Sequence, residues 1–277
     1  MKELRGRTAL LTGAGGGLGG YIARALADEG VDLVLCDLPA VSVDQLAAEL
    51  RSRGVRAELI PADLAHTGGL ETLVRHAEET AGPLDILVNN AGLEFGGGFA
   101  HQTREELEAI TAVNLVAVME LTRVTLPGML ERGRGQIVNV ASIAGKGPFP
   151  YLGSYCATKH GVVGFTHALR AEYAAAPVGF SVVCPIFITR VGMYARIEAD
   201  APEPPGPLRP LPPESVGAAV VDAIRRNRAE VLVARRPRAL LPALSAVAPS
   251  AATWLLNRRR FRQFADEYAR ALGRPGA

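Results

Sequence analysis

The sequence predicts an α/β protein built on a doubly wound parallel β-sheet, because short apolar segments alternate with longer helical segments along most of the 277 residues. The apolar segments show no polar alternation, which is typical of strands buried on both faces of a parallel sheet. Right-handed crossovers between such strands place helices on both sides. The predicted strands are residues 7–12, 32–36, 57–61, 84–89, 135–141, 179–185 and 230–234. The predicted helices are residues 18–29, 43–53, 70–80, 105–130, 155–174 and 213–227.

No internal break divides these units, so residues 1–234 are expected to form one domain and residues 235–277 a C-terminal extension. The proline-dense segment 200–213 is predicted to be a loop, either a cover over a site or a surface insertion. In the extension, arginines flank the uncharged stretch 239–256. This arrangement favours helices that cover a substrate cleft or contact a second subunit. A segment seated on a membrane surface is the alternative.

Composition excludes several classes of protein. The net charge of +2 gives no general attraction to nucleic acid. The three cysteines and five histidines show no metal-ligand spacing, so no metal site is expected. The N-terminus lacks a signal-peptide layout, and no stretch reads cleanly as a membrane span. We therefore expect a cytoplasmic protein with reduced thiols.

A glycine-rich turn lies between the first predicted strand and the first predicted helix, at residues 12–19. Glycine permits backbone conformations that other residues avoid and allows a ligand to approach closely. The start of the following helix presents free amide groups and the positive end of its dipole, which suits a pyrophosphate. The turn therefore predicts a dinucleotide site of the Rossmann type, with cofactor-binding residues Gly13, Gly16, Gly17, Leu18 and Gly19.

Asp37 ends the second predicted strand, about twenty residues after the glycine turn. A carboxylate at this position accepts hydrogen bonds from the adenosine ribose and repels a 2′-phosphate. The places where a basic residue would favour NADP hold Gly16 and Leu38, and neither carries a charge. The sequence therefore favours NAD over NADP as the cofactor.

Tyr155 and Lys159 stand four residues apart on a predicted helix, so their side chains share one face. A free tyrosine has a pKa near 10, and a neighbouring ammonium stabilises its phenolate form. Ser142 follows the fifth predicted strand, where its hydroxyl is expected to hold a substrate oxygen beside Tyr155. The three residues together predict acid–base chemistry on an alcohol or a carbonyl group.

These motifs occur in an order that resembles the short-chain dehydrogenase/reductase family, over about residues 6–234. The resemblance implies that Tyr155 exchanges the proton, that Ser142 orients the substrate oxygen, and that Lys159 binds the nicotinamide ribose. It implies that Asn114 holds a water in a proton relay. It also assigns cofactor contacts to Asp63, Leu64, Asn90, Ala91, Gly92, Pro185, Ile188 and Thr189.

One position departs from the family pattern. After the sixth predicted strand the family usually carries Pro-Gly followed by a threonine, whereas this chain has Pro185-Ile186 and then Thr189. The isoleucine side chain is expected to narrow or redirect the substrate pocket.

The residues expected around the substrate are mostly apolar, which favours a small hydrophobic alcohol or carbonyl compound over a sugar. A non-catalytic dinucleotide sensor or scaffold is the alternative, although relatives of that kind typically lose the tyrosine or the lysine. The family resemblance also implies a homo-dimer or homo-tetramer paired through the long helices. The expected substrate residues are Ser142, Tyr155, Glu94, Phe149 and Phe187, with Phe95, Tyr151 and the segment 187–194 nearby.

Overall fold

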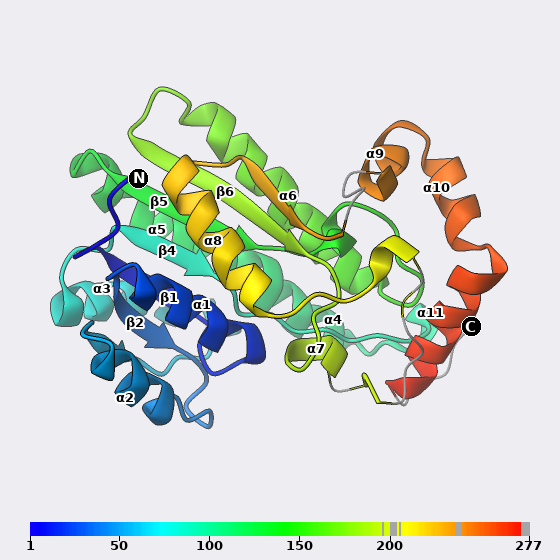
Figure 1. Cartoon of the computed structure of the whole chain (residues 1–277), viewed down its shortest axis with the longest axis horizontal. Helices are drawn as coiled ribbons and strands as arrows, with labels where there is room; N and C mark the ends of the chain where they lie inside the picture. Colours follow the sequence, from blue (N-terminus) through cyan, green and yellow to red (C-terminus); the bar gives the residue numbers. More distant parts are fainter. Residues whose placement is uncertain (196, 200–203, 205, 236–239, 273–277) are drawn as a thin grey trace.

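Seven parallel strands form one sheet in the order β3-β2-β1-β4-β5-β6-β7, which confirms the predicted doubly wound α/β fold (Figure 1). The computed structural model describes the whole chain except residues 196, 200–203, 205, 236–239 and 273–277. Each predicted strand is present. The strands are β1 (Thr8–Thr12), β2 (Asp32–Cys36), β3 (Ala57–Leu59), β4 (Ile86–Asn89), β5 (Gly135–Val140), β6 (Val178–Pro185) and β7 (Glu230–Val233).

The strand order reverses at β1, where Ala9 pairs with Leu33 of β2 on one side and with Ile86 of β4 on the other. The loops that leave β1 and β4 therefore diverge to opposite faces of the sheet. Such a reversal opens a crevice at the carboxyl ends of the strands, which is where open α/β sheets bind ligands.

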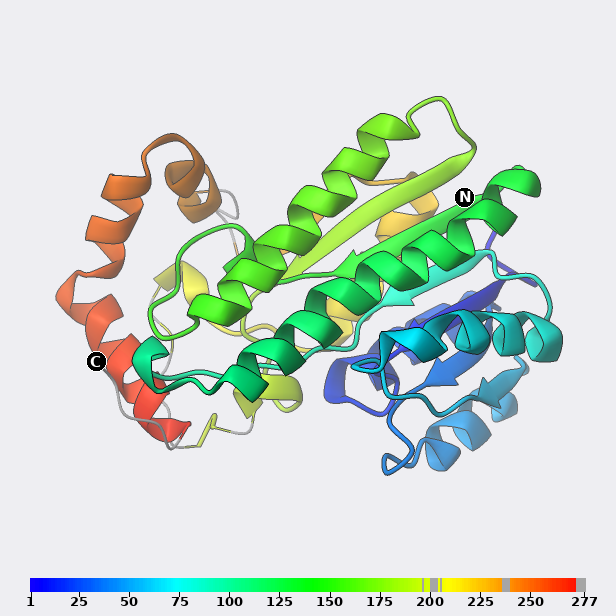
Figure 2. The same cartoon turned by 180° about the vertical axis from the view of Figure 1, so that it is seen from behind.

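Helices cover both faces of the sheet, with α1, α2 and α8 on the face seen in Figure 1 and α3, α5 and α6 on the face seen in Figure 2. Each layer encloses its own apolar core between helices and sheet. The predicted helices are confirmed as α1 (Gly17–Asp28), α2 (Asp44–Ser52), α3 (Leu70–Ala81), α6 (Gly153–Glu172) and α8 (Glu214–Arg226), and the structure adds the short α7 (Gly192–Ala195).

The helix predicted at residues 105–130 is interrupted in its middle. It consists of α4 (Arg104–Thr111), a π-helical turn (Ala112–Val116) and α5 (Ala117–Glu131). A π-helical turn adds one residue to the helix and often marks a functional site. By length and a mean hydropathy of 1.5 the combined segment passes as a membrane span among the described residues, yet half of that apolar window is buried within the protein. It is a core helix of the domain.

The C-terminal extension forms α9 (Leu240–Val247), α10 (Pro249–Leu256) and α11 (Arg259–Ala271), which lie beyond the carboxyl ends of the strands (Figures 1 and 2). The apolar face of α11 is turned inward, because Phe264 and Tyr268 are only 7% and 4% exposed. This packing agrees with a cover over the cleft and gives no support to a membrane contact by α11. Arg236 and Arg238, which belong to the first basic cluster of the extension, lie outside the described residues.

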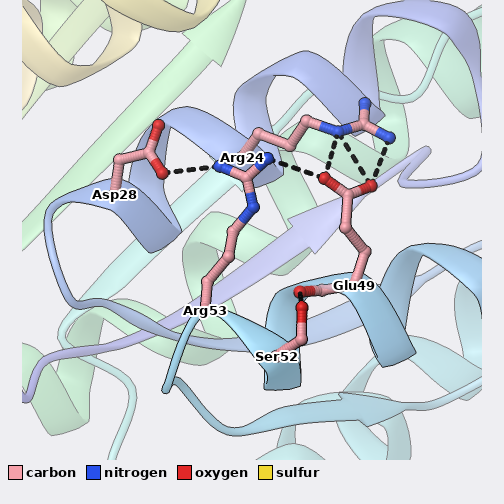
Figure 3. Close-up of polar contacts among 5 residues, drawn as sticks. All are labelled: Arg24, Asp28, Glu49, Ser52 and Arg53. Atoms are coloured by element: carbon pink, nitrogen blue, oxygen red, sulfur yellow. Dashed lines mark hydrogen bonds and ion pairs between the residues drawn. The ribbon is translucent and has the colours of Figure 1, made fainter.

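Ion pairs fasten α1 to α2 on the surface of the nucleotide-binding half (Figure 3). Glu49 of α2 accepts hydrogen bonds from Arg24 of α1 at 2.7 Å and from Arg53 at 2.7 Å, and Arg53 also binds Asp28 of α1 at 2.6 Å. The Arg24 hydrogen bond is the main cause that lowers the pKa of Glu49 to about 2. Because α1 follows the glycine turn and α2 follows Asp37, this network fixes the relative position of those two segments.

We expect Glu49→Gln to lower the free energy of unfolding by about 0.5–1 kcal/mol at pH 7, a modest loss because the side chain is a third exposed (33%). Folding depresses the pKa of Glu49 from 4.5 to about 2. Its contribution is therefore full above pH 4.5 and is lost as the pH falls towards 2. Urea denaturation at several pH values measures this. Glu79→Gln is the control, since Glu79 meets Arg75 only at 4.0 Å on the surface. Equal losses in both variants would contradict the prediction.

Candidate active site

A cavity of about 600 Å³ opens at the carboxyl ends of the central strands, where the crevice is expected. It brings together the glycine turn, the segments after β2, β3, β4, β5 and β6, and the start of α6. Most of the predicted site residues line it, namely Gly13, Gly16, Gly17, Leu18, Asp37, Leu38, Asp63, Leu64, Asn90, Ala91, Gly92, Glu94, Ser142, Phe149, Tyr155, Lys159, Pro185, Phe187 and Ile188. Of the other predicted residues, Gly19, Asn114 and Thr189 lie behind this surface.

The glycine turn fits a phosphate group because it has no room for side chains. Gly13 has a φ of +66°, and a Cβ atom there would lie 2.8 Å from the Cα atom of Ala91. A Cβ atom on Gly19 would overlap the carbonyl oxygen of Gly13, so Gly19 allows α1 to begin directly against the turn. No side chain caps the N-terminus of α1 at Gly16. Its first amide groups therefore remain able to bind an anion.

The end of the cavity formed by the glycine turn and the loops after β2 and β3 is acidic. The Oδ2 atom of Asp37 accepts a hydrogen bond from the amide of Gly15 at 2.8 Å, and Oδ1 accepts one from the amide of Leu38 at 2.8 Å. These bonds hold the Asp37 carboxylate beside the glycine turn. Asp63 lines the same end, and Lys159 is the only basic side chain among the described residues that line the cavity.

Hydrogen bonds join the turn after β4 to the end of β1. The Thr12 hydroxyl accepts from the amides of Asn90 at 3.0 Å and Ala91 at 3.2 Å, and the Asn90 side chain donates to the Thr12 carbonyl at 3.0 Å. Asn90 thus shapes the centre of the site by holding two loops together.

The three residues predicted to carry the acid–base chemistry come from the end of β5 and from α6. Ser142 follows β5, and its hydroxyl accepts from the amide of Ala144 at 3.1 Å and shares a hydrogen bond with Tyr155. Tyr155 and Lys159 share one face of α6 and are 7% and 4% exposed. The Lys159 Nζ atom lies 5.7 Å from the centre of the Tyr155 ring and donates to the Val140 carbonyl at 3.1 Å.

Burial governs the titration of this pair in the protein without a cofactor. It raises the pKa of Tyr155 well above its usual value, the negative charge of Glu94 raises it further, and the hydrogen bond from Ser142 lowers it. Burial also lowers the pKa of Lys159 to about 8. The sequence suggested a phenolate at Tyr155 stabilised by Lys159. In the structure, the effect of burial on the pKa of Tyr155 exceeds the effect of the Lys159 ammonium, which donates to the Val140 carbonyl, so the phenolate is not preformed. Tyr155 is a neutral phenol at neutral pH, ready to donate a proton.

Asn114 lies in the π-helical turn and is fully buried. Its side chain accepts from the amide of Leu93 at 2.7 Å and donates to the Leu93 carbonyl at 2.9 Å and to the Thr158 hydroxyl at 3.2 Å. A Cβ atom on Gly92 would lie 3.3 Å from the Asn114 side-chain oxygen and 3.5 Å from Lys159 Nζ. Both side chains therefore approach Gly92.

Aromatic rings enclose the other end of the cavity, next to Tyr155. The Phe187 ring lies 5.1 Å from Tyr194, 5.5 Å from Phe264 and 5.8 Å from Tyr268, between ring centres. Tyr151, which was expected near this pocket, is not among its described lining residues, and its hydroxyl donates to Asp266 of α11 at 2.5 Å.

Three further residues named in the sequence analysis, Phe95, Thr189 and Ile186, lie near the aromatic end of the cavity. Phe95 packs behind the surface of the cavity, against the apolar cluster around Tyr155. Thr189 is not among the described lining residues, and its amide and its hydroxyl donate to the Leu211 carbonyl at 3.0 and 3.5 Å. The amide of Leu211, in the described part of the proline-dense segment 200–213, donates to the Phe187 carbonyl at 3.0 Å. This bond therefore holds the residues after β6 against that segment. Ile186, the departure from the family pattern, is buried and lines the cavity.

The sequence reasoning missed Tyr268, which reaches the cavity from α11. Its hydroxyl donates to Glu94 at 2.7 Å. A signal was present, because Phe261, Phe264, Ala265 and Tyr268 follow the spacing of one apolar helix face. No group of side chains suited to a metal occurs among the described residues.

Comparisons with known proteins agree with this geometry. The short chain dehydrogenase family model matches residues 7–202. Ketoacyl reductase HetN of Nostoc sp. is 42% identical over 237 residues, which cover 86% of this chain and 82% of that protein. D-beta-hydroxybutyrate dehydrogenase of Cupriavidus necator is 34% identical over 72% of this chain and 77% of that protein. A crystal structure of an actinorhodin polyketide ketoreductase variant with NADPH is 33% identical, covers 84% of this chain and 97% of that one, and has a TM-score of 0.73.

The fold and the site define a dinucleotide-binding oxidoreductase that acts on a ketone or alcohol group. The chain belongs to the short-chain dehydrogenase family.

Replacing Lys159 with methionine removes a buried ammonium, and we expect the cofactor-free protein to gain about 1–3 kcal/mol of stability at pH 7. Folding lowers the pKa of Lys159 from 10.5 to about 8. Between these values the unfolded chain binds more protons, so the unmodified protein gains stability as the pH rises through them. The stability gained by Lys159→Met is therefore largest below pH 8 and decreases towards pH 10.

Urea denaturation of the two proteins at several pH values between 7 and 10 measures both effects. Lys2→Met is the control, because Lys2 is exposed. A Lys159→Met protein less stable than the unmodified one at pH 7 would show that the lysine stabilises the fold.

Proposed function

We propose that the protein is an NAD(H)-dependent oxidoreductase that interconverts a ketone or aldehyde and an alcohol on a small hydrophobic substrate. The observation that carries the proposal is the convergence of Ser142, Tyr155 and Lys159 at the aromatic end of a cavity whose other end is a phosphate-binding turn. No observation favours the alternative of a non-catalytic sensor.

In the reduction direction the Ser142 hydroxyl donates a hydrogen bond to the substrate oxygen and holds it beside Tyr155. The bound reduced nicotinamide supplies the hydride. Tyr155 donates its proton to the substrate oxygen as negative charge develops there. Lys159 stabilises the resulting phenolate, and Asn114 positions a water in the relay that returns the proton. The raised pKa of Tyr155 supports this direction, because it keeps the phenol protonated.

The acidic end of the cavity supports NAD as the cofactor. Asp37 holds its carboxylate beside the glycine turn, where it suits ribose hydroxyls. A 2′-phosphate would meet this negative charge, and Lys159, the only basic side chain among the described lining residues, belongs to the catalytic group. The similar ketoreductase structure contains NADPH, so this chain differs in preference from that protein under our proposal.

The names of the similar ketoacyl reductase and hydroxybutyrate dehydrogenase support a substrate with a carbonyl or hydroxyl group on an acyl chain. We assign catalysis to residues 1–234 and a substrate cover to residues 235–277, since Tyr268 of α11 reaches the cavity. Three free cysteines support a cytoplasmic location. We also propose a homo-dimer or homo-tetramer paired through the long helices that begin near Glu105 and Tyr155. The 18-residue apolar window within Arg104–Glu131 is only half buried, which supports this pairing.

Tyr155→Phe is expected to reduce turnover by at least a hundredfold while NADH binds with unchanged affinity, because the ring remains and the transferable proton is lost. Turnover is followed by the absorbance of NADH during a screen of hydrophobic ketones, and affinity by calorimetry. Tyr173→Phe is the control, since Tyr173 lies on the far end of α6. Near-normal turnover in Tyr155→Phe would eliminate the proposed acid.

Asp37→Ala is expected to weaken NAD binding about 10–100-fold, because hydrogen bonds to a charged acceptor are lost. NADP should bind the variant more tightly than it binds the unmodified protein, because the repelling charge is gone. Calorimetry with both cofactors measures the two changes. Asp44→Ala is the control, since Asp44 is exposed at the start of α2, where its carboxylate accepts a hydrogen bond from Ser42. Equal affinity of the unmodified protein for NAD and NADP would contradict the proposed preference.

A further inference from the structure

A single acidic side chain, Glu94, lies in the half of the cavity where the aromatic rings and Tyr155 meet, among the described lining residues. Its surroundings are apolar, because Phe149, Leu152 and Phe187 line the same half. A carboxylate among such neighbours is retained at a cost in desolvation.

Glu94 is held in place by the C-terminal extension. The Tyr268 hydroxyl of α11 donates to the Glu94 Oε1 atom at 2.7 Å, and the Tyr268 side chain is 4% exposed. Glu94 belongs to the loop after β4, so this bond joins two segments that are 174 residues apart in the chain. The carboxylate is thereby fixed within the cavity wall.

The charge of Glu94 is felt at the reacting group. It is the second largest cause, after burial, that raises the pKa of Tyr155, and it also raises the pKa of Tyr268. A charge that disfavours a phenolate at Tyr155 disfavours any other anion bound beside it in the same way.

We propose that Glu94 is a specificity-determining residue that selects uncharged carbonyl substrates against those carrying a carboxylate near the ketone. The proposal rests on the ketone–alcohol activity proposed above. Two like charges held in one pocket at an effective dielectric constant near 20 discriminate by a factor on the order of 10–100. A free keto acid is thus excluded, whereas the ester of the same acid is accepted.

The test compares acetoacetate with ethyl acetoacetate, which carry the same ketone and differ in charge. We measure kcat/KM for NADH-dependent reduction of each in the unmodified protein and in Glu94→Gln. The glutamine is isosteric, and its amide oxygen still accepts the hydrogen bond from Tyr268. The ratio of acid to ester is expected to rise at least tenfold in Glu94→Gln.

Two further variants separate charge from structure. Tyr268→Phe removes the hydrogen bond and keeps the carboxylate, so its acid-to-ester ratio should stay as in the unmodified protein. Glu79→Gln on the outer surface of α3 removes a distant charge and should also leave the ratio unchanged. If Glu94 only fastens α11, Tyr268→Phe will change the ratio whereas Glu94→Gln, which keeps the hydrogen bond from Tyr268, will not, and the proposal is overturned.

An unchanged ratio in Glu94→Gln would equally overturn it. Absence of reduction of either compound, together with normal NADH binding, would count against the proposed ketone reduction itself. The selectivity then remains measurable, because calorimetry gives the affinities of the acid and the ester for the protein–NADH complex. Equal discrimination by the unmodified protein and Glu94→Gln in that measurement would end the proposal independently of turnover.

Discussion

The hydrogen bonds between the ends of β1 and β4 are the constraint on which the site depends. The strand order reverses between these strands, so the chain leaves them towards opposite faces and a crevice opens between the two loops. The Thr12 hydroxyl closes the base of that crevice by accepting from two amides of the turn after β4. The glycine turn, Gly92 and the carboxylate of Asp37 take their positions from this junction.

On this base the site places a cation and a phenol out of water. Within the part of the chain that the structure describes, no carboxylate pairs with the Lys159 ammonium or hydrogen-bonds the Tyr155 hydroxyl, and burial opposes the charged form of both groups. Such an arrangement destabilises the fold, which is typical of active sites. It also keeps the phenol protonated until a bound cofactor and substrate change the local charge. Under the proposed function, the burial of Lys159 and Tyr155 lowers the stability of the fold and keeps a proton on Tyr155 that can be transferred.

Most of the fold could be predicted from the sequence, because continuous apolar strands and periodic helices follow local rules. The residues that line the cavity near the glycine turn could also be predicted, since Gly13, Asp37 and Lys159 lie within or beside recognisable motifs. Two features of the site could not be predicted from the sequence. The π-helical turn that buries Asn114 depends on packing against the loop at Leu93, which spacing alone does not encode. The reach of Tyr268 into the cavity depends on contacts formed across 174 residues.

The aromatic end of the cavity therefore owes part of its shape to the extension, whereas the residues that we propose for catalysis lie at the end of β5 and on α6. Phe264 and Tyr268 complete a wall that Phe187 and Tyr194 begin. Because Asp266 of α11 also accepts a hydrogen bond from Tyr151, two polar contacts, at Asp266 and at Tyr268, hold this helix against the domain. Under the proposed function, a change in α11 would alter the substrate pocket without touching Ser142, Tyr155 or Lys159, so specificity and catalysis would depend on different elements of the chain.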